Sequence, residues 1–510
     1  MTGGSSLILV TEELPTIREL WRVRSLPRLA QALISFGYGM EQSVLCGVSS
    51  TSALVRLPPQ WTQRPIHIWV NVNIRIPIGD LLPVPRLLWY CAPQQRPGMH
   101  KWTKRALWTV LILVLLAYLG LGVWIRTNET QLIFHRELPF ISPPPSLVLN
   151  QERVEFSQVD GTRLFAWIVQ PLPPDHSDVW VLFFHGSEGG VSLRGNDYDD
   201  FRSLGFNVMA PEYPGYEGSP GSPSEVIIER EAGVAYDYLR QVKNVPAKSI
   251  VVYGVSLGSA VAVDLASRVQ AGALIIQAGF TSVLAMGQKE YPFLPLRWLL
   301  KNRFESDRKI SKVRMPVLVI HSSDYDRFHP IEHGQRLYDL APVPKQLLVI
   351  RGRHGVDAAS ATVNPNLFPD IATFLDEQAG FQVRRPLPSI APVFLATMES
   401  KGMDAAITEY HSLRREAAKR YKFREAELDR LGNELFRKER VDEAIAVLRF
   451  NAEQFAESFN AFDSLGDAYA AAGKDAEAIQ NYQRSLTLFP DKENYSRPKL
   501  EKLEQRFKLR

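Results

Sequence analysis

The stretch Val251-Val252-Tyr253-Gly254-Val255-Ser256-Leu257-Gly258-Ser259 decides the fold. Its β-branched start predicts a strand, and the apolar run at 260–266 predicts a helix. Between them, Gly-x-Ser-x-Gly predicts a sharp turn that strains the serine and brings strand and helix so close that positions 254 and 258 need glycine. This turn lifts Oγ of Ser256 above the sheet edge and directs the N–H of Leu257 at a developing oxyanion. The stretch therefore predicts a nucleophilic serine.

The segments around this turn alternate between short apolar runs and helical patterns. Such alternation predicts a mostly parallel, doubly wound α/β sheet, and we assign residues 150–379 to it. Its first two strands form a hairpin around Asp160-Gly161. The predicted strands span residues 153–156, 164–169, 179–184, 206–210, 250–253, 273–277, 317–321 and 346–350, and the clearest predicted helices span 225–242 and 331–340.

A nucleophilic serine of this kind needs an acid and a histidine later in the chain. His354 follows the last predicted strand, in a loop from which an imidazole reaches the serine proton. The acid comes from the stretch 321–330, which holds two aspartates. We favour Asp326, which stands four residues before the Pro330 that starts a helix, while Asp324 remains the alternative. The aspartate that is not the acid caps or braces the loop.

Other segments supply the surroundings of the serine. In His185-Gly186-Ser187-Glu188, a glycine-rich turn after a strand, we assign the second oxyanion donor to the N–H of Ser187, with Glu188 as the alternative. The segment 213–219 is expected to form a further wall of the cleft. Residues 280–310 are rich in aromatic residues, leucine and proline, and either cap an acyl group or pack on the sheet as helices. No metal-ligand cluster or phosphate loop is found, so no cofactor or metal is expected.

Together these pieces resemble the α/β-hydrolase superfamily over residues 150–380, and within it the small membrane-anchored branch of esterase, thioesterase and peptidase-like serine hydrolases. The matching motifs are His185-Gly186, Tyr213 to Ser219, Gly254-x-Ser256-x-Gly258, Asp326-x-x-x-Pro330-x-Glu332-His333-Gly334 and His354-Gly355. The resemblance implies a catalytic triad of Ser256, Asp326 and His354. Two departures stand out. Ser187-Glu188 replaces the usual Asn-Ala, which puts a carboxylate near the oxyanion, and the acid loop is one residue longer than usual.

The N-terminal part contains an apolar span. Residues 106–125 carry no charge and are long enough to cross a hydrocarbon core of about 30 Å. Lys101, Lys104 and Arg105 precede the span, so the positive-inside rule predicts a signal anchor over 99–126 with a cytoplasmic N-terminus. The catalytic domain then lies on the periplasmic or extracellular side, after a spacer at 127–149. Residues 1–98 have nine arginines and no lysine, and we expect the biological chain to start at Met99; the alternative is a poorly ordered N-terminal extension.

The C-terminal part contains an internal repeat. Leu431-Gly432 recurs as Leu465-Gly466, an offset of 34 residues, which is the tetratricopeptide period. A second pair of motifs, at 442–445 and 476–479, recurs at the same offset. Residues 393–510, after a linker at 380–392, therefore resemble a tetratricopeptide solenoid with repeats at 425–458 and 459–492. Helices at 403–415 and 499–507 are expected to flank the repeats.

Composition narrows the function further. A net charge of +4 is too small to indicate binding to nucleic acid, and two cysteines among 510 residues suggest no disulfide framework. We expect a membrane-anchored serine hydrolase that cleaves an acyl ester, thioester or amide, with repeats that bind a protein partner. The alternatives are a serine peptidase of the same fold and a catalytically inert scaffold that presents the repeats. An epoxide hydrolase or dehalogenase is disfavoured, because Ser256 stands where those enzymes use aspartate.

Overall fold

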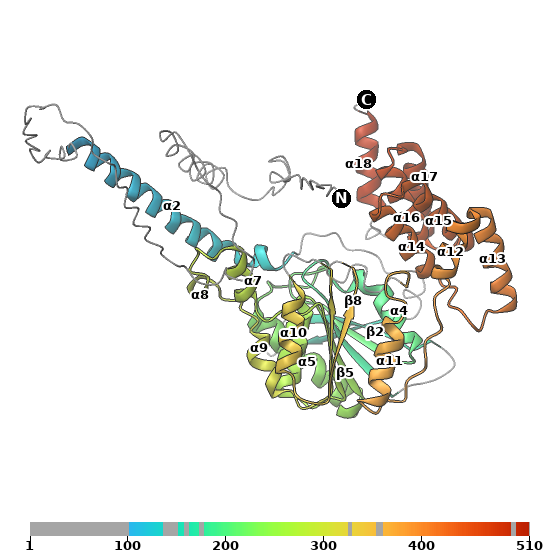
Figure 1. Ribbon diagram of the computed structural model, residues 1–510, viewed down its shortest axis with the longest axis horizontal. Coiled ribbons are helices and arrows are strands. Elements are labelled where there is room, and N and C mark those ends of the chain that lie inside the picture. The colour runs from blue at the N-terminus through green and yellow to red at the C-terminus, as the bar shows by residue number, and fades with distance from the viewer. Residues whose placement is uncertain are drawn as a thin grey trace, which may run out of the picture. The chain divides into compact units, whose positions relative to one another are not determined.

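A computed structural model describes residues 101–135, 151–157, 163–172, 178–324, 329–352, 361–490 and 496–508. In this part of the chain a long apolar helix precedes an eight-stranded sheet, and a run of helices follows it (Figure 1). The strands are β1 Gln151–Ser157, β2 Arg163–Val169, β3 Trp180–Phe184, β4 Asn207–Pro211, β5 Ile250–Val255, β6 Ala273–Gln277, β7 Val317–Ser322 and β8 Lys345–Ile350.

The sheet has the order β1-β2-β4-β3-β5-β6-β7-β8. Strands β1 and β2 form the predicted antiparallel hairpin, with Gln151 opposite Val169, and β2 also pairs antiparallel with β4. All the other pairs are parallel, so the carboxyl ends of β3, β5, β6, β7 and β8 meet at one edge. The predicted α/β class is confirmed, and Ser256 stands at that edge, directly after β5.

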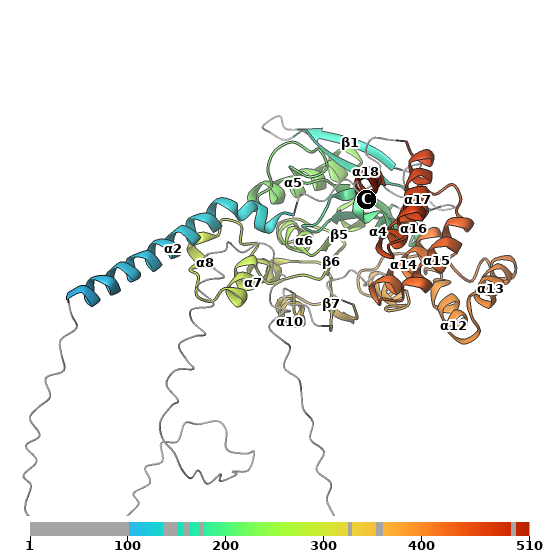
Figure 2. The same ribbon diagram turned by 90° about the horizontal axis from the view of Figure 1, so that it is seen from above.

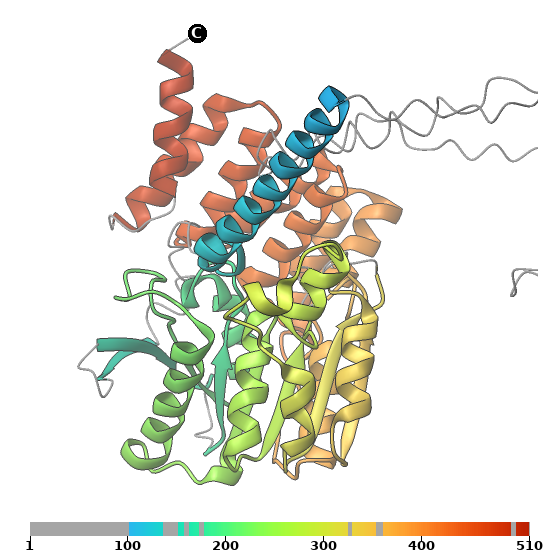
Figure 3. The ribbon, with the colours of Figure 1, turned by 90° about the vertical axis from the view of Figure 1, so that its left-hand side faces the viewer.

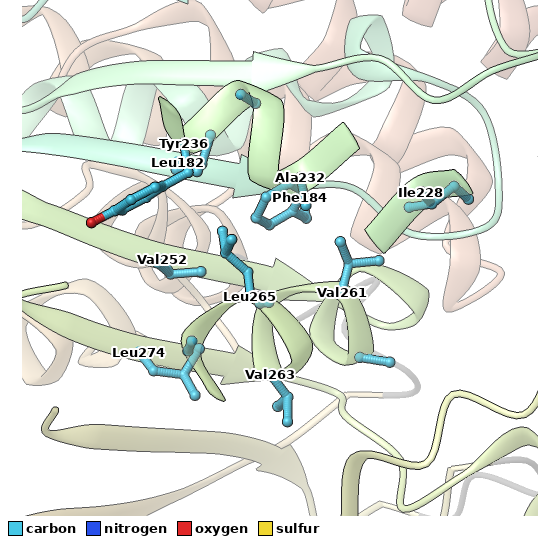
Figure 4. Packing of buried hydrophobic residues seen from close by; sticks show 14 of the residues in the cluster. Leu182, Phe184, Ile228, Ala232, Tyr236, Val252, Val261, Val263, Leu265 and Leu274 are labelled. Atoms are coloured by element: carbon cyan, nitrogen blue, oxygen red, sulfur yellow. The ribbon is translucent and has the colours of Figure 1, made fainter. Parts of the chain in front are cut away.

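Helices cover both faces of the sheet because its central strands are apolar on both sides. Leu182 and Phe184 point to the face covered by α5, α6 and α10, whereas Val181 and Phe183 point to the face covered by α4 and α11. Figure 4 shows the first face, where Val261 and Leu265 of α6 pack near Val252 of β5. These helices are α4 Gly195–Ser203, α5 Glu225–Asp237, α6 Leu257–Arg268, α10 Ile331–Leu340 and α11 Leu367–Glu377. The end of the predicted helix 225–242 is a π-helical turn, Tyr238–Val242.

The apolar span lies in helix α2, Lys101–Ile133, which is long and apolar enough to cross a membrane over Arg105–Ile133. Its first half is exposed on all described sides, and its last turns contact the segment after β6. That segment contains the short helices α7 Val283–Glu290, α8 Leu296–Leu299 and α9 Ser306–Lys309. We call residues 283–304 the cap segment.

The C-terminal residues form helical hairpins. Helices α14 and α15 begin 34 residues before α16 and α17, the offset seen in the sequence motifs. Gly432 and Gly466 each lie against the partner helix: a Cβ on Gly466 would come within 2.6 Å of the Tyr482 ring, and one on Gly432 would overlap Leu448. The helices are α12 Ala391–Lys401, α13 Met403–Glu416, α14 Glu425–Arg437, α15 Val441–Gln454, α16 Phe459–Ala471, α17 Asp475–Leu488 and α18 Ser496–Lys508 (Figure 2).

A buried ion cluster joins these helices to the sheet domain. Asp200 on α4 is fully buried and lies 2.7 Å from Arg424, 2.7 Å from Arg430 and 3.4 Å from Lys422. Their charges hold the pKa of the Asp200 carboxyl well below its usual range, despite burial, which acts the other way. The cluster therefore fixes α14 and the residues just before it to α4, the helix that follows the His-Gly turn.

Candidate active site

Ser256 lies between β5 and α6 with φ 53° and ψ −118°, outside the favourable regions for a residue with a side chain. The surrounding structure enforces this conformation, because the N–H of Ser256 donates to the carbonyl of Gln277 (2.9 Å) and its own carbonyl accepts from the N–H of Ser259 (2.9 Å). Backbone strain of this kind concentrates at functional positions. The side chain is largely buried, with 8% exposed.

Two glycines make the turn possible. A Cβ on Gly254 would overlap the backbone of Gly258, and a Cβ on Gly258 would overlap the carbonyl oxygens of Phe184 and His185. The sharp turn predicted from Gly-x-Ser-x-Gly is therefore present, for the predicted steric reason. Helix α6 begins at Leu257, so its N-terminal N–H groups lie beside the serine.

The His-Gly turn after β3 approaches the serine from the neighbouring strand. A Cβ on Gly186 would lie 3.4 Å from Cβ of Ser256, so this backbone packs against the serine side chain. The carbonyl of Ser187 accepts hydrogen bonds from the hydroxyl of Tyr216 (3.0 Å) and the N–H of His135 (3.1 Å). Glu188 is exposed and bridges to His135 through the backbone. The turn that carries the predicted donor is thus fixed beside Ser256.

Residues that sequence reasoning expected as a cleft wall support this turn from inside. Tyr213 and Tyr216 are buried, and the Tyr213 ring lies 4.0 Å from that of His185, between ring centroids. The Tyr213 hydroxyl donates to the carbonyl of His185 (3.0 Å). Their role in the described structure is to position the His-Gly backbone.

Two glutamates missed by the sequence analysis complete this support. Glu212 bonds Nε2 of His185 (2.9 Å) and accepts from the N–H of Val191 (2.9 Å). Glu217 accepts from the N–H of Ser192 (3.1 Å) and from its hydroxyl. Burial, with the charge of Glu212 second, raises the pKa of Glu217 to about 9. No local signal marks these residues as a pair, because their partners lie 21 to 27 residues away.

Arg194 is a further residue that the sequence did not single out. It ends the 3-10 helix Val191–Arg194 after the His-Gly turn, and its guanidinium lies 3.6 Å from Asp197. A Cβ on Gly186 would lie 3.4 Å from Nη2 of Arg194 and equally far from Cβ of Ser256. A positive charge therefore borders the space next to the serine.

The other predicted triad positions follow β7 and β8. Asp324, the alternative acid, lies just past β7, and its Oδ2 accepts from the N–H of Gly352 (2.8 Å). Its own N–H donates to the hydroxyl of Ser322 (3.0 Å), so Asp324 ties together the loops after β7 and β8. Asp326 and His354 lie outside the described residues, and both assignments stay predictions. Among the residues described, no group of three or more histidine, cysteine, aspartate or glutamate side chains is arranged to hold a metal.

Comparisons with known proteins identify the family of this chain. The model of the alpha/beta hydrolase family matches residues 181–443, a little more than half of the chain. The Mycobacterium tuberculosis protein Rv2307c is 36% identical over 251 residues, covering 49% of this chain and 87% of its own. Lysophosphatidylserine lipase ABHD12 of Danio rerio is 32% identical over 190 residues, covering 33% of this chain and 48% of its own.

Among solved structures, the esterase Pf2001 of Pyrococcus furiosus is 19% identical, with a TM-score of 0.36, over 47% of this chain and 99% of its own. The family match starts in β3, includes the whole Ser256 turn and ends at the beginning of α15. By this match, the chain belongs to the alpha/beta hydrolase family.

Proposed function

We propose that this protein is a membrane-anchored serine hydrolase that cleaves an acyl ester, thioester or amide through an acyl-enzyme. The observation that carries the proposal is the conformation of Ser256, held at φ 53° where strand β5 meets helix α6. A strained serine beside a helix N-terminus and a second backbone turn is the arrangement that acyl transfer needs. Family membership and the name of the zebrafish lipase support a hydrolytic reaction.

In the proposed mechanism, Oγ of Ser256 attacks the acyl carbonyl while His354 takes the hydroxyl proton. Asp326 orients His354 and stabilises the imidazolium. The N–H groups of Leu257 and Ser187 bind the oxyanion of the tetrahedral intermediate. His354 then protonates the leaving oxygen, sulfur or nitrogen as the bond to the acyl carbon breaks. Water, activated by the same histidine, hydrolyses the acyl-enzyme and restores Ser256.

The proposal also covers the two flanking parts. Helix α2 is the anchor, with the N-terminus cytoplasmic and the hydrolase on the other side of the membrane, as Lys101, Lys104 and Arg105 suggest. The hairpins α14–α15 and α16–α17 are tetratricopeptide-like repeats that bind a protein partner. Their equal offset of 34 residues and the glycine contacts between paired helices support this reading.

The test is labelling of the full chain, in membranes, with a fluorophosphonate, which phosphonylates an activated serine. We expect the chain to be labelled, and we expect prior treatment with a serine-directed inhibitor to block the labelling. We also expect the chain to hydrolyse p-nitrophenyl acyl esters. A series of ester chain lengths, with matched thioesters and amides, defines the substrate class. If neither labelling nor hydrolysis occurs while the repeats still bind a partner, the inert-scaffold alternative replaces the enzyme.

A further inference from the structure

The cap segment and helix α2 share one apolar surface. Outside α2, the described part of the chain exposes three large aromatic side chains, and all of them lie within eight residues of each other in the cap segment. They are Tyr291, Phe293 (64% exposed) and Trp298 (80% exposed). Exposed apolar groups that gather in this way mark an interaction site, whereas scattered ones do not.

Helix α2 is joined to this segment by several contacts. The hydroxyl of Tyr118 donates to the carbonyl of Phe293 (2.8 Å), and Nη1 of Arg126 donates to the carbonyl of Leu299 (2.9 Å). Ile125 packs with Leu294, Leu296 and Leu300 in a small apolar cluster. Figure 3 shows α2 running past α7 and α8. The cap segment therefore lies beside the last turns of the apolar helix.

These contacts fix the depth of the cap segment relative to the apolar span. They begin at Tyr118, seven residues before the span ends at Ile125, which corresponds to about 10 Å of helix. When residues 106–125 cross the hydrocarbon core, the last two turns of the span have the cap segment alongside. The segment is then at the level of the outer part of the bilayer, where tryptophan and tyrosine are favoured.

The backbone of the cap segment is suited to that environment. Irregular backbone is tolerated at membrane depth only where its polar groups are satisfied by protein. Side chains of α2 supply such partners: Tyr118 and Arg126 bond two carbonyls, and the buried Glu129 accepts from the N–H groups of Lys301 (2.8 Å) and Asn302 (2.7 Å). The exposed cations Lys289, Arg297 and Lys301 complement anionic headgroups.

An apolar groove of about 280 Å³ separates α2 from the cap segment, lined by Leu119, Gly122, Val123, Leu294 and Leu299 among others. Its apolar lining suits a lipid acyl chain. The segment also follows the carboxyl end of β6, at the sheet edge that carries Ser256. A membrane contact here brings the candidate active-site edge toward the leaflet.

We propose that the cap segment is immersed in the outer leaflet beside α2, and that the enzyme draws an amphiphilic acyl substrate from that leaflet. The inference rests on the proposed anchor and deepens the proposed function by naming the source of the substrate. The occupant of the surface is the phospholipid bilayer, with an acyl chain in the groove.

The first experiment measures immersion without using activity. The full chain with Cys46→Ser and Cys91→Ser, which removes both native thiols, receives one cysteine by Trp298→Cys and carries a polarity-sensitive fluorophore. The matched control is Val343→Cys, an 81% exposed apolar position just before β8, at the opposite edge of the parallel strands. In phosphatidylcholine–phosphatidylglycerol vesicles, nitroxides on the acyl chains should quench the label at 298 several-fold more than the label at 343. Equal quenching, or no incorporation into vesicles, would overturn the proposal.

The second experiment measures the consequence for substrate. We expect the double variant Phe293→Ser, Trp298→Ser to lose several-fold activity on a long-chain acyl ester embedded in vesicles. Hydrolysis of a soluble short-chain ester should stay unchanged, and Val343→Ser should change neither. Equal loss on both esters would mean a structural role and overturn the substrate part. Absent fluorophosphonate labelling in the wild type would instead defeat the enzyme proposal, while the quenching result would still decide the membrane contact.

Discussion

At the scale of single residues, a substitution at Ser256 can remove the side-chain hydroxyl without changing the strained turn. Replacement by alanine removes the proposed nucleophile and keeps the backbone that Gly254 and Gly258 permit. We expect Ser256→Ala to abolish fluorophosphonate labelling and to lower turnover by about 10⁶, the loss recorded for the nucleophile of another serine hydrolase. His354→Ala should cost about as much, and the double variant no more than either, because the residues act as a unit. The measurement is ester hydrolysis, with thermal unfolding as a control for folding. If the losses in turnover of the two single variants multiplied in the double variant, Ser256 and His354 would not act as a unit.

The two aspartates after β7 are expected to affect turnover differently when each is replaced by asparagine. Asp324 bonds the N–H of Gly352, so Asp324→Asn keeps an oxygen that accepts this bond and should reduce turnover little. In the proposed triad, Asp326→Asn removes the charge that stabilises the imidazolium, and a substitution of this type costs about 10⁴ in a well-studied triad. Turnover measured for both variants on one ester decides the assignment. The reverse order of effects would move the acid to Asp324.

The residue scale also shows where the sequence is informative. The sharp turn at Ser256 and the need for its two glycines were predictable, because strand, turn and helix are contiguous in sequence. The roles of Glu212 and Glu217 were not, since they act on His185, Val191 and Ser192 through contacts that only the folded sheet brings together. The contacts of Tyr213 and Tyr216 with the carbonyls of His185 and Ser187 likewise join residues distant in sequence.

At the scale of elements, the strand predictions agree with the structure to within one or two residues. The reason is that β3, β5, β6 and β7 are almost wholly buried on both faces, so each appears in the sequence as an apolar run. Boundaries set by tertiary contacts were harder to predict. The helix from Glu225 changes to π-helical geometry at Tyr238, and α12 begins at Ala391, inside the segment expected to be a linker.

The helical hairpins allow a test at this scale. In α16, a Cβ on Gly466 would lie 2.6 Å from Cε1 of Tyr482, so Gly466→Ala forces the paired helices apart. Overpacking costs about 1–3 kcal/mol, while the better helix propensity of alanine returns up to about 1 kcal/mol. We therefore expect a net loss of roughly 1–2 kcal/mol in the unfolding free energy of this region, measured by chemical denaturation. Ala471→Val, at an exposed position of the same helix, should change it by no more than about 0.5 kcal/mol. A neutral or stabilising Gly466→Ala would show that α16 and α17 do not pack so closely.

At the scale of the whole molecule, side-chain contacts connect the sheet domain to the C-terminal helices. Helix α4 follows the His-Gly turn and contacts α14 through Asp200, and the family match itself includes α14. Thr362, before α11, donates to Glu434 of α14 and adds a second connection. The described C-terminal helices are therefore packed against the sheet domain and continuous with it.

The ion cluster at Asp200 provides the test of that continuity. Asp200→Asn removes the carboxylate that pairs with Lys422, Arg424 and Arg430, and it leaves Glu427, 2.9 Å from Arg424, as the acidic partner beside these three cations in the described structure. Breaking a buried ion pair by removing one partner costs about 3–5 kcal/mol, so we expect the C-terminal helices to unfold at lower temperature than the sheet domain.

Because the pKa of Asp200 is lowered on folding, the contribution of its carboxylate to stability is present above the unfolded pKa of about 3.9 and is lost only as the pH falls through the lower folded pKa. The effect should therefore be the same at about pH 5 and pH 8. Calorimetry of the full chain measures it, and Glu155→Gln, which breaks the exposed pair with Arg163, should cost no more than about 1 kcal/mol. If Asp200→Asn melts like the wild type in one transition, the cluster does not hold the two parts together.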